Sequence, residues 1–425
     1  MRYGIHTIDD FTLDGKTVLY RADMNQPVNR EEGRLESCSR IRACIPTIRE
    51  LLDRNAKVVI LIHQGSDIEY HNFFTTKPHR DVLEKLLERP VGFPEDVCGP
   101  AARDAVRQLQ PGEVLLLDNV RFLAQEQTLF ENALKLSFGE QASTLLVEKL
   151  APLGDLYVCD AFAAAHRSQP SLCGFELVMP SAMGRLFEKE YCRLSELMES
   201  PKRPCTFILG GAKVSDAFGV MEEVLRKKTA DRILTGGVTA NLLLAAAGIS
   251  IGEKSREYIS THGYERYYDV SRRLLGTYRD QISLPLDAAW AEDGKRAEGE
   301  VKAVPSGAGI FDIGRETAAE YSRMIQSSST IFINGPMGVF EREEFSLGTR
   351  KVWEALAGTG GETILGGGDS IAAAERFCEV EQFSYVSTGG GALIRFLSGE
   401  ELPVIQALRY GAELFAGDYN YEDRA

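Results

Sequence analysis

The chain has 425 residues, of which 44% are hydrophobic and 26% charged, and Asp and Glu outnumber Lys and Arg by 62 to 48. The length predicts two or three globular domains, and the net charge of −14 argues against nonspecific binding to nucleic acid. The eight cysteines form no C-x-x-C pair, the six histidines show no H-E-x-x-H spacing, and the longest apolar runs have only strand length. We therefore expect a cytoplasmic protein without disulfides, a zinc site or a membrane span.

Short apolar strands alternate with helical patterns in the first half of the chain. The sequence predicts strands at 17–20, 58–62, 114–117 and 155–158. Helices are expected between them, at about 40–54, 80–88, 100–109 and 140–151. Continuous apolar runs of this length are typical of a parallel sheet covered by helices on both faces.

The second half repeats this pattern. Its predicted strands lie at 206–209, 232–234, 283–286, 330–333, 363–365 and 383–386. Between the halves, residues 184–198 carry apolar residues at helical spacing, and this helix should end before Pro201 and Pro204. The pattern predicts an α/β protein with two doubly wound parallel-sheet lobes joined by an interdomain helix.

Basic side chains follow the predicted strands of the first half or lie near their ends. They are Arg21, Arg40, His63, Arg121, His166 and Arg167. Because ligands of doubly wound sheets bind outside the carboxyl ends of the strands, these side chains should converge at one edge. Arginine recognises carboxylate and phosphate through two parallel hydrogen bonds, so the sequence predicts an anion site there.

Glycine-rich segments follow the strands of the second half. They are Gly210-Gly211-Ala212-Lys213, Thr235-Gly236-Gly237, Asn334 to Glu341, Gly366-Gly367-Gly368-Asp369-Ser370 and Ser387 to Gly391. Glycine lets the backbone approach an anion closely, and a helix predicted over 370–377 would aim its positive N-terminus at that anion. Asp369 could hold a magnesium ion beside phosphates. The spacing fits neither a P-loop nor G-x-G-x-x-G, so a nucleotide with its magnesium is expected in another kind of cradle.

Taken together, the motifs resemble the phosphoglycerate kinase family, collinearly over essentially the whole chain. They are Asp23 to Pro27, Arg40-Ile-Arg-Ala, His63-Gln-Gly, Asn119-Val-Arg-Phe, Asp160-Ala-Phe with His166-Arg167, Gly210 to Asp216, Asn334 to Glu341, Gly366 to Ser370 and Ser387 to Gly391. Several look most like the archaeal branch. The resemblance implies reversible phosphoryl transfer between Mg-ATP and the carboxylate of 3-phosphoglycerate, giving 1,3-bisphosphoglycerate, by a hinge-bending enzyme that is usually monomeric.

The resemblance also implies domain boundaries and an acid-binding site. Residues 1–180 would form the acid-substrate lobe, 181–200 the interdomain helix and 201–399 the nucleotide-binding lobe, with a tail at 400–425 returning to the first lobe. The positions that match the family's acid site are Asp23, Asn25, Arg40, His63, Arg121 and Arg167. His166 is a further substrate-binding candidate, with a packing role as the alternative.

The resemblance assigns the nucleotide site to the second lobe. Its positions are Gly211, Ala212, Lys213, Gly236, Gly237, Asn334, Pro336, Glu341, Gly366, Gly367, Gly368, Asp369 and Ser370. Lys213 would bind the nucleotide phosphates, Asp369 would hold Mg²⁺, and Glu341 would accept hydrogen bonds from the ribose. The glycines at 211, 236 and 237 would flank the adenine.

Catalysis would rest on positioning and electrostatics, with no covalent nucleophile. Arg40 would stabilise the phosphoryl group in flight, with Lys213 on the nucleotide side. Backbone N–H groups of Gly368, Gly390 and Gly391 would be offered to the transferring phosphoryl group.

Three positions depart from the family pattern. Ser66 stands where the family has an arginine that grips the substrate's phosphate, and loss of such a contact typically costs about 1.5–3 kcal/mol. Asp67 and Glu69 add negative charge nearby, Cys159 replaces an asparagine, and Ala217 replaces a second lysine. The side chains that could compensate for Ser66 are Tyr70, His71, Lys77, His79 and Arg80.

Two alternatives follow from these departures. One is a related kinase that forms the acyl phosphate of a different carboxylic acid, and the other is a weakly active nucleotide-binding pseudoenzyme. The presence of Arg40, Lys213 and Asp369 weighs against the pseudoenzyme.

Overall fold

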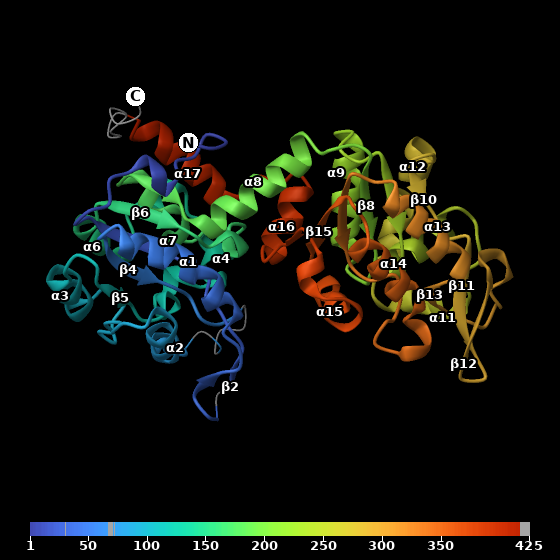
Figure 1. Ribbon diagram of the computed structural model, residues 1–425, viewed down its shortest axis with the longest axis horizontal. Helices are drawn as coiled ribbons and strands as arrows, with labels where there is room; N and C mark the ends of the chain where they lie inside the picture. Colours follow the sequence, from blue (N-terminus) through green and yellow to red (C-terminus); the bar gives the residue numbers. More distant parts are fainter. Residues whose placement is uncertain (30, 67–70, 72, 417–425) are drawn as a thin grey trace. The chain divides into compact units, whose positions relative to one another are not determined.

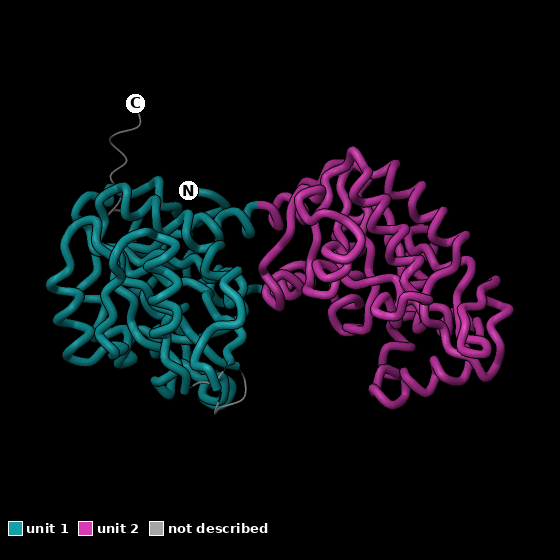
Figure 2. The backbone as a smooth tube through the Cα atoms, turned by 60° about the horizontal axis from the view of Figure 1, so that its bottom comes forward, with its two compact units in different colours: residues 1–192, 401–425 teal, residues 193–400 magenta. Residues whose placement is uncertain are grey.

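The computed structural model describes residues 1–29, 31–66, 71 and 73–416. The chain divides into two compact units, one of residues 1–192 and 401–425 and the other of residues 193–400 (Figure 2). The boundary falls inside helix α8 (Arg185–Glu199), which corresponds to the helix predicted at 184–198. Each unit is built around its own parallel sheet, so the predicted fold class is confirmed.

The first unit contains a five-stranded parallel sheet of order β5-β4-β1-β6-β7 (Figure 1). Its strands are β1 (Thr17–Arg21), β4 (Lys57–Leu61), β5 (Val114–Leu116), β6 (Leu156–Cys159) and β7 (Ser181–Met183). Val158 of β6 packs in the core on one face of this sheet, while the neighbouring Tyr157 points to the opposite face and stacks on Phe175. Because both faces are buried, the strands read as continuous apolar runs in the sequence.

Helices cover the sheet of the first unit, which also contains a short, separate hairpin. The helices are α1 (Ser39–Asp53), α2 (Lys77–Leu87), α3 (Pro100–Gln108), α4 (Thr128–Leu134), α5 (Phe138–Ala142), α6 (Leu145–Leu150), α7 (Pro170–Cys173) and α17 (Pro403–Leu414), and the hairpin is β2 (Val28–Asn29) with β3 (Arg34–Leu35). The single helix predicted at 140–151 is wrong. Thr144 is extended there and its hydroxyl donates to the Gln141 carbonyl at 2.7 Å, so α5 ends and α6 begins anew.

Segments from both ends of the chain complete the first unit. Helix α17 packs beside β7, where the N–H of Val404 donates to the Ala165 carbonyl at 3.3 Å. The Arg409 guanidinium donates to the Tyr191 hydroxyl of α8 at 2.6 Å. At the start of α8, Arg185 forms ion pairs with three carboxylates. Residues 417–425 of the predicted tail lie outside the described residues.

The second unit contains a six-stranded parallel sheet of order β10-β9-β8-β14-β15-β16. Its strands are β8 (Cys205–Leu209), β9 (Arg232–Thr235), β10 (Ile282–Ser283), β14 (Thr330–Asn334), β15 (Glu362–Gly366) and β16 (Tyr385–Val386). Its helices are α9 (Val214–Arg226), α10 (Gly237–Ala246), α11 (Glu253–Thr261), α12 (Tyr268–Tyr278), α13 (Arg315–Gln326), α14 (Leu347–Ala357), α15 (Gly368–Phe377) and α16 (Gly390–Leu397). Trp353 of α14 is fully buried in the core on one face, and Phe207 contacts Phe332 on the other.

A three-stranded antiparallel sheet, which the sequence did not predict, is also part of the second unit. It has the order β12-β11-β13, with β11 (Asp287–Glu292), β12 (Lys295–Glu300) and β13 (Ile310–Ile313). The strand predicted at 283–286 is wrong in extent, because β10 ends at Ser283 and Pro285 precedes the change of sheet. The strand predicted at 383–386 begins only at Tyr385, since Phe383 ends a 3₁₀ turn.

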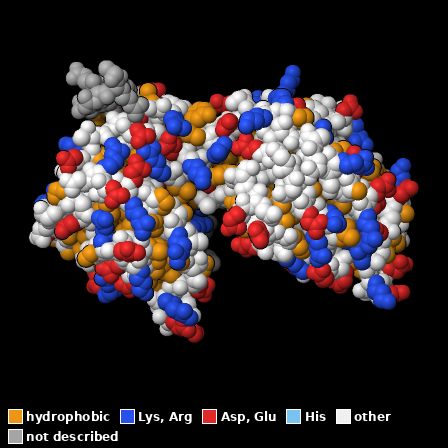
Figure 3. Space-filling model, viewed as in Figure 1, with side chains coloured by type: hydrophobic (Ala, Val, Ile, Leu, Met, Phe, Trp, Pro, Cys, Tyr) orange, Lys and Arg blue, Asp and Glu red, His pale blue; other side chains and the backbone are white. Residues whose placement is uncertain are grey.

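The surface carries charges of both signs. On the face shown in Figure 3, Lys and Arg side chains are interspersed with Asp and Glu, without a continuous basic area among the residues drawn in colour. Within the described part of the chain, no helix has the length and apolar character needed to cross a membrane.

Candidate active site

The carboxyl-terminal edge of the first sheet gathers several of the predicted acid-binding side chains. Asp23, which follows β1, accepts a hydrogen bond from Arg40 of α1 at 2.7 Å and is only 7% exposed. His63, which follows β4, places Nε2 4.0 Å from the other oxygen of Asp23. Asn25 is fixed by two hydrogen bonds to the Gly65 backbone, at 2.8 and 3.1 Å. Side chains from two strand ends and one helix therefore meet, as the topology predicts.

The charges of four guanidinium groups act on His63. The Nη2 of Arg21 lies 3.0 Å from His63 Nδ1, and because arginine stays protonated, Nδ1 must accept and Nε2 carries the proton. Burial is the first cause that holds the pKa of His63 well below its usual value, followed by the positive charges of Arg121, Arg21, Arg40 and Arg167. His63 is therefore neutral at pH 7, and the surroundings of this imidazole favour an anion.

A buried network that the sequence did not indicate lies beneath this group. The Nε of Arg21 donates to the Ser171 hydroxyl at 2.9 Å. That hydroxyl donates in turn to Glu126 at 2.7 Å, and the Ser171 N–H donates to the same carboxylate at 2.6 Å. Glu126 is 1% exposed, and burial raises the pKa of its carboxyl group. This network holds the Arg21 guanidinium in place against His63.

A polar cavity of about 420 Å³ opens above these residues. Of the predicted acid-binding residues, Asn25 and Arg40 line it, while Asp23, His63 and Arg121 are buried. The Arg121 guanidinium donates to the carbonyl of Ser66 at 3.3 Å, at the wall of the cavity. Among the predicted arginines of the acid site, Arg40 is therefore the one whose side chain lines this cavity.

Arg167 and His166 lie to one side of this cavity. Arg167 donates to the Thr128 hydroxyl at 3.3 Å and lies 3.7 Å from Glu131, and both of these partners belong to α4. Its charge still acts on His63. His166 is partly buried in the turn that precedes Arg167, and it is not among the residues that line the cavity.

Of the described side chains considered as compensation for Ser66, one lies in the cavity. His71 places Nδ1 2.7 Å from the Ser66 hydroxyl, and both residues line the cavity. Lys77 and Arg80 form ion pairs with acidic side chains elsewhere. Outside the described residues lie Asp67, Glu69 and Tyr70.

His79 has a structural role instead. It is fully buried in α2, and its Nε2 donates to the Met24 carbonyl at 3.1 Å, below the strand-end loop. Burial lowers the pKa of His79 to about 4.

The neutral state of His79 makes stability depend on pH. Below about pH 6.5 the unfolded chain binds a proton at this position that the folded chain does not, so acidification favours unfolding. Between pH 7.5 and pH 5, we expect wild type to lose about 2 kcal/mol of unfolding free energy through protonation of His79 in the unfolded chain. The His79→Gln variant, whose new side chain does not titrate, should not show this loss. Urea unfolding of both proteins at both pH values measures the loss. An equal loss in wild type and variant would contradict the assignment of a neutral, buried His79.

The glycine-rich loops of the second unit are locked together by backbone hydrogen bonds. The N–H of Gly211 donates to the Pro336 carbonyl at 2.7 Å, and the N–H of Gly237 donates to the Met337 carbonyl at 2.8 Å. Gly237 has φ +55°, and a Cβ there would lie 2.7 Å from the backbone nitrogen of Gly211. Glycine is required because three strand-end loops approach one another more closely than side chains allow.

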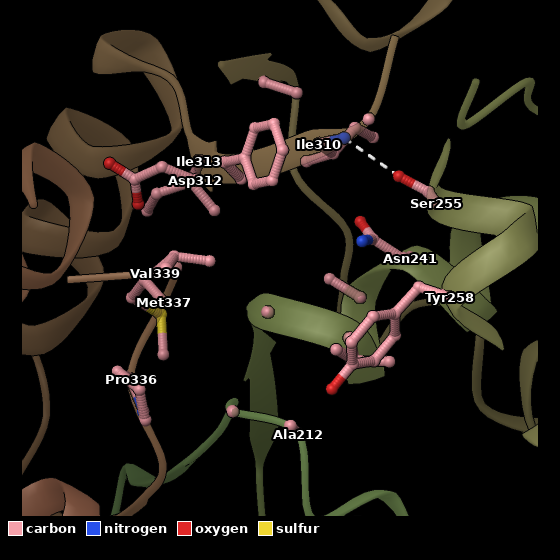
Figure 4. A pocket seen from close by; sticks show the side chains of 18 of the residues that line it. Ala212, Asn241, Ser255, Tyr258, Ile310, Asp312, Ile313, Pro336, Met337 and Val339 are labelled. Atoms are coloured by element: carbon pink, nitrogen blue, oxygen red, sulfur yellow. Dashed lines mark hydrogen bonds between the residues drawn. The ribbon is translucent and has the colours of Figure 1, made fainter. Parts of the chain in front are cut away.

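These loops form one wall of a largely apolar cavity of about 450 Å³ (Figure 4). The predicted nucleotide residues that line it are Gly211, Ala212, Gly237, Pro336, Glu341 and Asp369. The opposite wall comes from β13 and α11, and includes Ile310, Phe311 and Tyr258. The sequence missed this wall, because neither α11 nor the antiparallel sheet that contains β13 was predicted.

Other predicted residues support the loops or lie at the rim. Ser370 is buried, and its hydroxyl accepts the N–H of Gly335 at 2.8 Å. Gly367 has φ +80°, and a Cβ there would lie 2.4 Å from the Asn334 side-chain oxygen. The predicted residues that do not line the cavity are Lys213, Gly236, Asn334, Gly366, Gly367, Gly368, Ser370, Gly390 and Gly391.

Lys213 and Asp369 form an exposed ion pair at the rim, with Nζ 3.4 Å from the carboxylate. Asp369 lies in the first turn of α15, and Lys213 caps α9, so two helix N-termini point to this edge. Among the described residues, no group of three metal-ligating side chains was found. One exposed carboxylate fits Mg²⁺, which keeps several waters and binds through one or two carboxylates together with substrate phosphates.

Comparison with known proteins decides between the interpretations of the sequence. The family model described as phosphoglycerate kinase matches residues 8–400. The chain belongs to the phosphoglycerate kinase family.

Relatives and solved structures agree with this family. The chain is 44% identical to the phosphoglycerate kinase of Methanothermobacter thermautotrophicus, covering 95% of this chain and 96% of that protein. It is 42% identical to the enzyme named phosphoglycerate kinase in Thermococcus kodakarensis, covering 96% and 98%. The crystal structure of phosphoglycerate kinase from Pyrococcus horikoshii is similar with a TM-score of 0.84 and 40% identity, covering 97% of this chain and all of that one.

These findings confirm the predicted resemblance, including its archaeal character. They also favour the phosphoglycerate kinase interpretation over a related acyl-phosphate kinase and over a pseudoenzyme. The chain is thus a kinase of a family that uses ATP and ADP as substrates.

Two of the three departures from the phosphoglycerate kinase pattern are buried. Cys159 is fully buried at the end of β6, and burial raises the pKa of its thiol to about 12. Ala217 is 1% exposed in α9, where a lysine would have to be accommodated in the interior. Ser66 is therefore the one departure that lies in a candidate binding cavity.

Proposed function

We propose that this chain transfers a phosphoryl group reversibly between Mg-ATP and the carboxylate of 3-phospho-D-glycerate, giving 1,3-bisphosphoglycerate, as a step of glycolysis and gluconeogenesis. The observation that carries the proposal is the division of chemistry between the two units. The first holds a polar cavity backed by arginines and a neutral histidine. The second holds a glycine-walled, largely apolar cavity with a lysine and an aspartate at its rim.

The acid would bind in the first unit. Asn25, held by the Gly65 backbone, would contact the substrate's polar groups. The Nε2–H of His63 would donate a hydrogen bond to the bound acid. Asp23 accepts a hydrogen bond from one nitrogen of Arg40, which leaves the other N–H groups of that guanidinium to reach the carboxylate and the phosphoryl group. Arg121 and Arg167 would add positive charge around the acid without exposing more basic surface.

The nucleotide would bind in the second unit. The adenine would lie in the cavity between the glycine loops and the Ile310–Phe311 wall, with Glu341 accepting from the ribose. Lys213 would exchange its ion pair with Asp369 for contacts to the phosphates. Asp369 would then hold Mg²⁺, which neutralises charge on the phosphates and orients them.

Phosphoryl transfer would then need only positioning and charge stabilisation. The acceptor oxygen has to come within about 3–3.5 Å of the phosphorus, in line with the leaving oxygen. Since the two substrates are assigned to different units, residues 1–180 and 201–399 would close on each other about the helix at 181–200. Arg40 would meet the charge on the transferring group from one side, and N–H groups at Gly368, Gly390 and Gly391 from the other.

Three further expectations complete the proposal. Mg²⁺ would be the divalent ion, because one carboxylate beside phosphates suits it. The enzyme would act as a monomer, as members of the resembled family usually do. It would work in the cytoplasm, in keeping with eight cysteines that form no disulfide among the described residues.

Trapping of the acyl phosphate tests this function. Hydroxylamine converts an acyl phosphate to a stable hydroxamate, so the protein is incubated with Mg-ATP, hydroxylamine and one carboxylic acid at a time. We expect hydroxamate from 3-phosphoglycerate well above that from glycerate or acetate. Hydroxamate formed mainly from another acid would favour the related kinase, and none from any acid would favour a pseudoenzyme.

Ser66 makes a separate prediction about affinity. Replacing it with arginine restores a guanidinium at the wall of the acid cavity, and we expect the KM for 3-phosphoglycerate to fall about tenfold with little change in the KM for ATP. Steady-state kinetics of wild type and Ser66→Arg measure the change, with Ser66→Ala as the control for loss of the hydroxyl. A KM that does not fall would mean that the substrate's phosphate lies elsewhere.

A further inference from the structure

We infer that three stacked rings beside the nucleotide cavity, Tyr258, His262 and Tyr264, position the loop that carries Lys213. We call these three residues the aromatic ladder. The inference deepens the proposed function, because it rests on the assignment of this cavity to the nucleotide. All of its contacts lie within the second unit.

The ladder begins at the cavity wall. Tyr258 of α11 lines the cavity and is 40% exposed, and Figure 4 shows its ring at the wall with the hydroxyl directed toward the side of Ala212. The ring of His262, one helical turn later, stacks on Tyr258 with centroids 4.0 Å apart and planes at 23°. His262 Nδ1 donates to the Tyr258 carbonyl at 2.8 Å, which fixes the imidazole against the tyrosine.

The ladder ends at the loop that carries Lys213. Tyr264 stacks on His262 with centroids 5.6 Å apart and planes at 26°. Its hydroxyl donates to the carbonyl of Ala212 at 3.0 Å, and Ala212 lines the cavity immediately before Lys213. A series of ring contacts and one hydrogen bond thus connects the wall of the base cavity to the residue before the phosphate-binding lysine.

A second set of contacts anchors the far end of the ladder. Tyr264 meets the ring of Tyr267 edge-on, with centroids 6.4 Å apart. Tyr267 in turn stacks on Phe218 of α9 at 5.2 Å, and α9 is the helix that Lys213 caps. The 3₁₀ turn at Tyr264–Tyr267 is therefore fixed both to the start of α9 and to its interior.

This arrangement has a consequence for nucleotide binding. A base that enters the cavity covers the exposed face of Tyr258, and the ladder then holds the Ala212 carbonyl where Lys213 faces the phosphates. The ladder is a positioning device, since only its first ring faces the cavity. Loss of its last hydrogen bond should weaken contacts to the phosphates and leave contacts to the base intact.

The test is Tyr264→Phe, which keeps the ring and removes only the hydroxyl that donates to Ala212. Binding of adenosine and of Mg-ADP to wild type and variant is measured by calorimetry or NMR titration. We expect Mg-ADP to bind about three- to tenfold more weakly to the variant, and adenosine to bind within twofold of wild type. The KM for ATP should rise, while the KM for 3-phosphoglycerate stays constant. Tyr268→Phe, a tyrosine of α12 outside the ladder, is the matched control and should change neither ligand.

A second variant tests the middle of the ladder. His262→Leu removes the stacking ring without touching the Tyr264 hydroxyl, and it should show the same selective loss of Mg-ADP binding. Unchanged Mg-ADP affinity in both variants would overturn the inference. Equal weakening of adenosine and Mg-ADP binding would also overturn it, because the ladder would then only support the wall of the nucleotide cavity. If wild type bound neither ligand, the nucleotide assignment itself would fall and the inference with it.

Discussion

Replacement of Arg40 by alanine is expected to lower kcat for phosphoryl transfer by about a thousandfold or more, as loss of an arginine from a phosphoryl-transfer site does. Arg40 is 46% exposed at its side chain, whereas Arg21 and Arg121 are buried, so it is the guanidinium able to reach a bound substrate. Its position is fixed by the hydrogen bond of 2.7 Å to Asp23. Coupled kinetics at saturating Mg-ATP and 3-phosphoglycerate measure the loss.

Two controls make the Arg40 result specific. Arg40→Lys keeps the charge but not the planar fork, so it should recover only part of the rate. Arg42→Ala removes an exposed arginine from the same helix and should leave kcat unchanged. Mg-ADP affinity should be constant in all three variants, because the nucleotide cavity belongs to the second unit. An Arg40→Ala enzyme with more than a tenth of the wild-type kcat would remove Arg40 from the chemistry.

Replacement of Asp369 by alanine should abolish Mg²⁺-dependent transfer, with an expected loss of about a thousandfold in kcat/KM. Asp369 is the carboxylate at the rim of the nucleotide cavity, beside Lys213 and at the N-terminus of α15. Without it the metal loses its protein ligand, and the charge of the phosphates is no longer balanced. Activity of the variant is measured across a Mg²⁺ titration, with wild type in EDTA as the metal-free reference.

The Asp369 prediction distinguishes a metal ligand from a structural residue. Adenosine should bind the variant as it binds wild type, since the apolar part of the cavity is unchanged. Glu375→Ala, an exposed carboxylate further along the same helix, should keep full activity. Wild-type activity in Asp369→Ala at low Mg²⁺ would refute the metal assignment.

The sheets could be predicted because their strands have a simple physical signature. Residues 58–62 and 331–333 are continuous apolar runs since both faces of each parallel sheet are buried, and the structure has β4 and β14 there. Strand β12 has the sequence Lys-Arg-Ala-Glu-Gly-Glu, which lacks an apolar alternation, so neither it nor its sheet was predicted. The break at Thr144 lies in a turn closed by backbone and side-chain hydrogen bonds to Gln141, which periodicity does not detect.

The candidate sites were predictable to the extent that strand ends define them. The carboxyl ends of parallel strands meet at one edge, so Asp23, His63 and the glycine loops could be brought together from the sequence alone. The network joins Arg21 to Ser171 and Glu126, which lie more than a hundred residues further along the chain, and nothing in the sequence marks Glu126 as buried. Tyr258 was missed for the same reason, because its place at the cavity wall depends on packing between distant elements.

The measurement that tests the account most directly is turnover of the purified protein with Mg-ATP and 3-phosphoglycerate, coupled to reduction of the acyl phosphate by glyceraldehyde-phosphate dehydrogenase. The account predicts robust, Mg²⁺-dependent turnover with kcat on the order of 1–100 s⁻¹ or above, which would also mean that the surroundings of Ser66 compensate for the missing arginine. Normal Mg-ATP binding without turnover would contradict it, because the first unit would then hold a different acid or none.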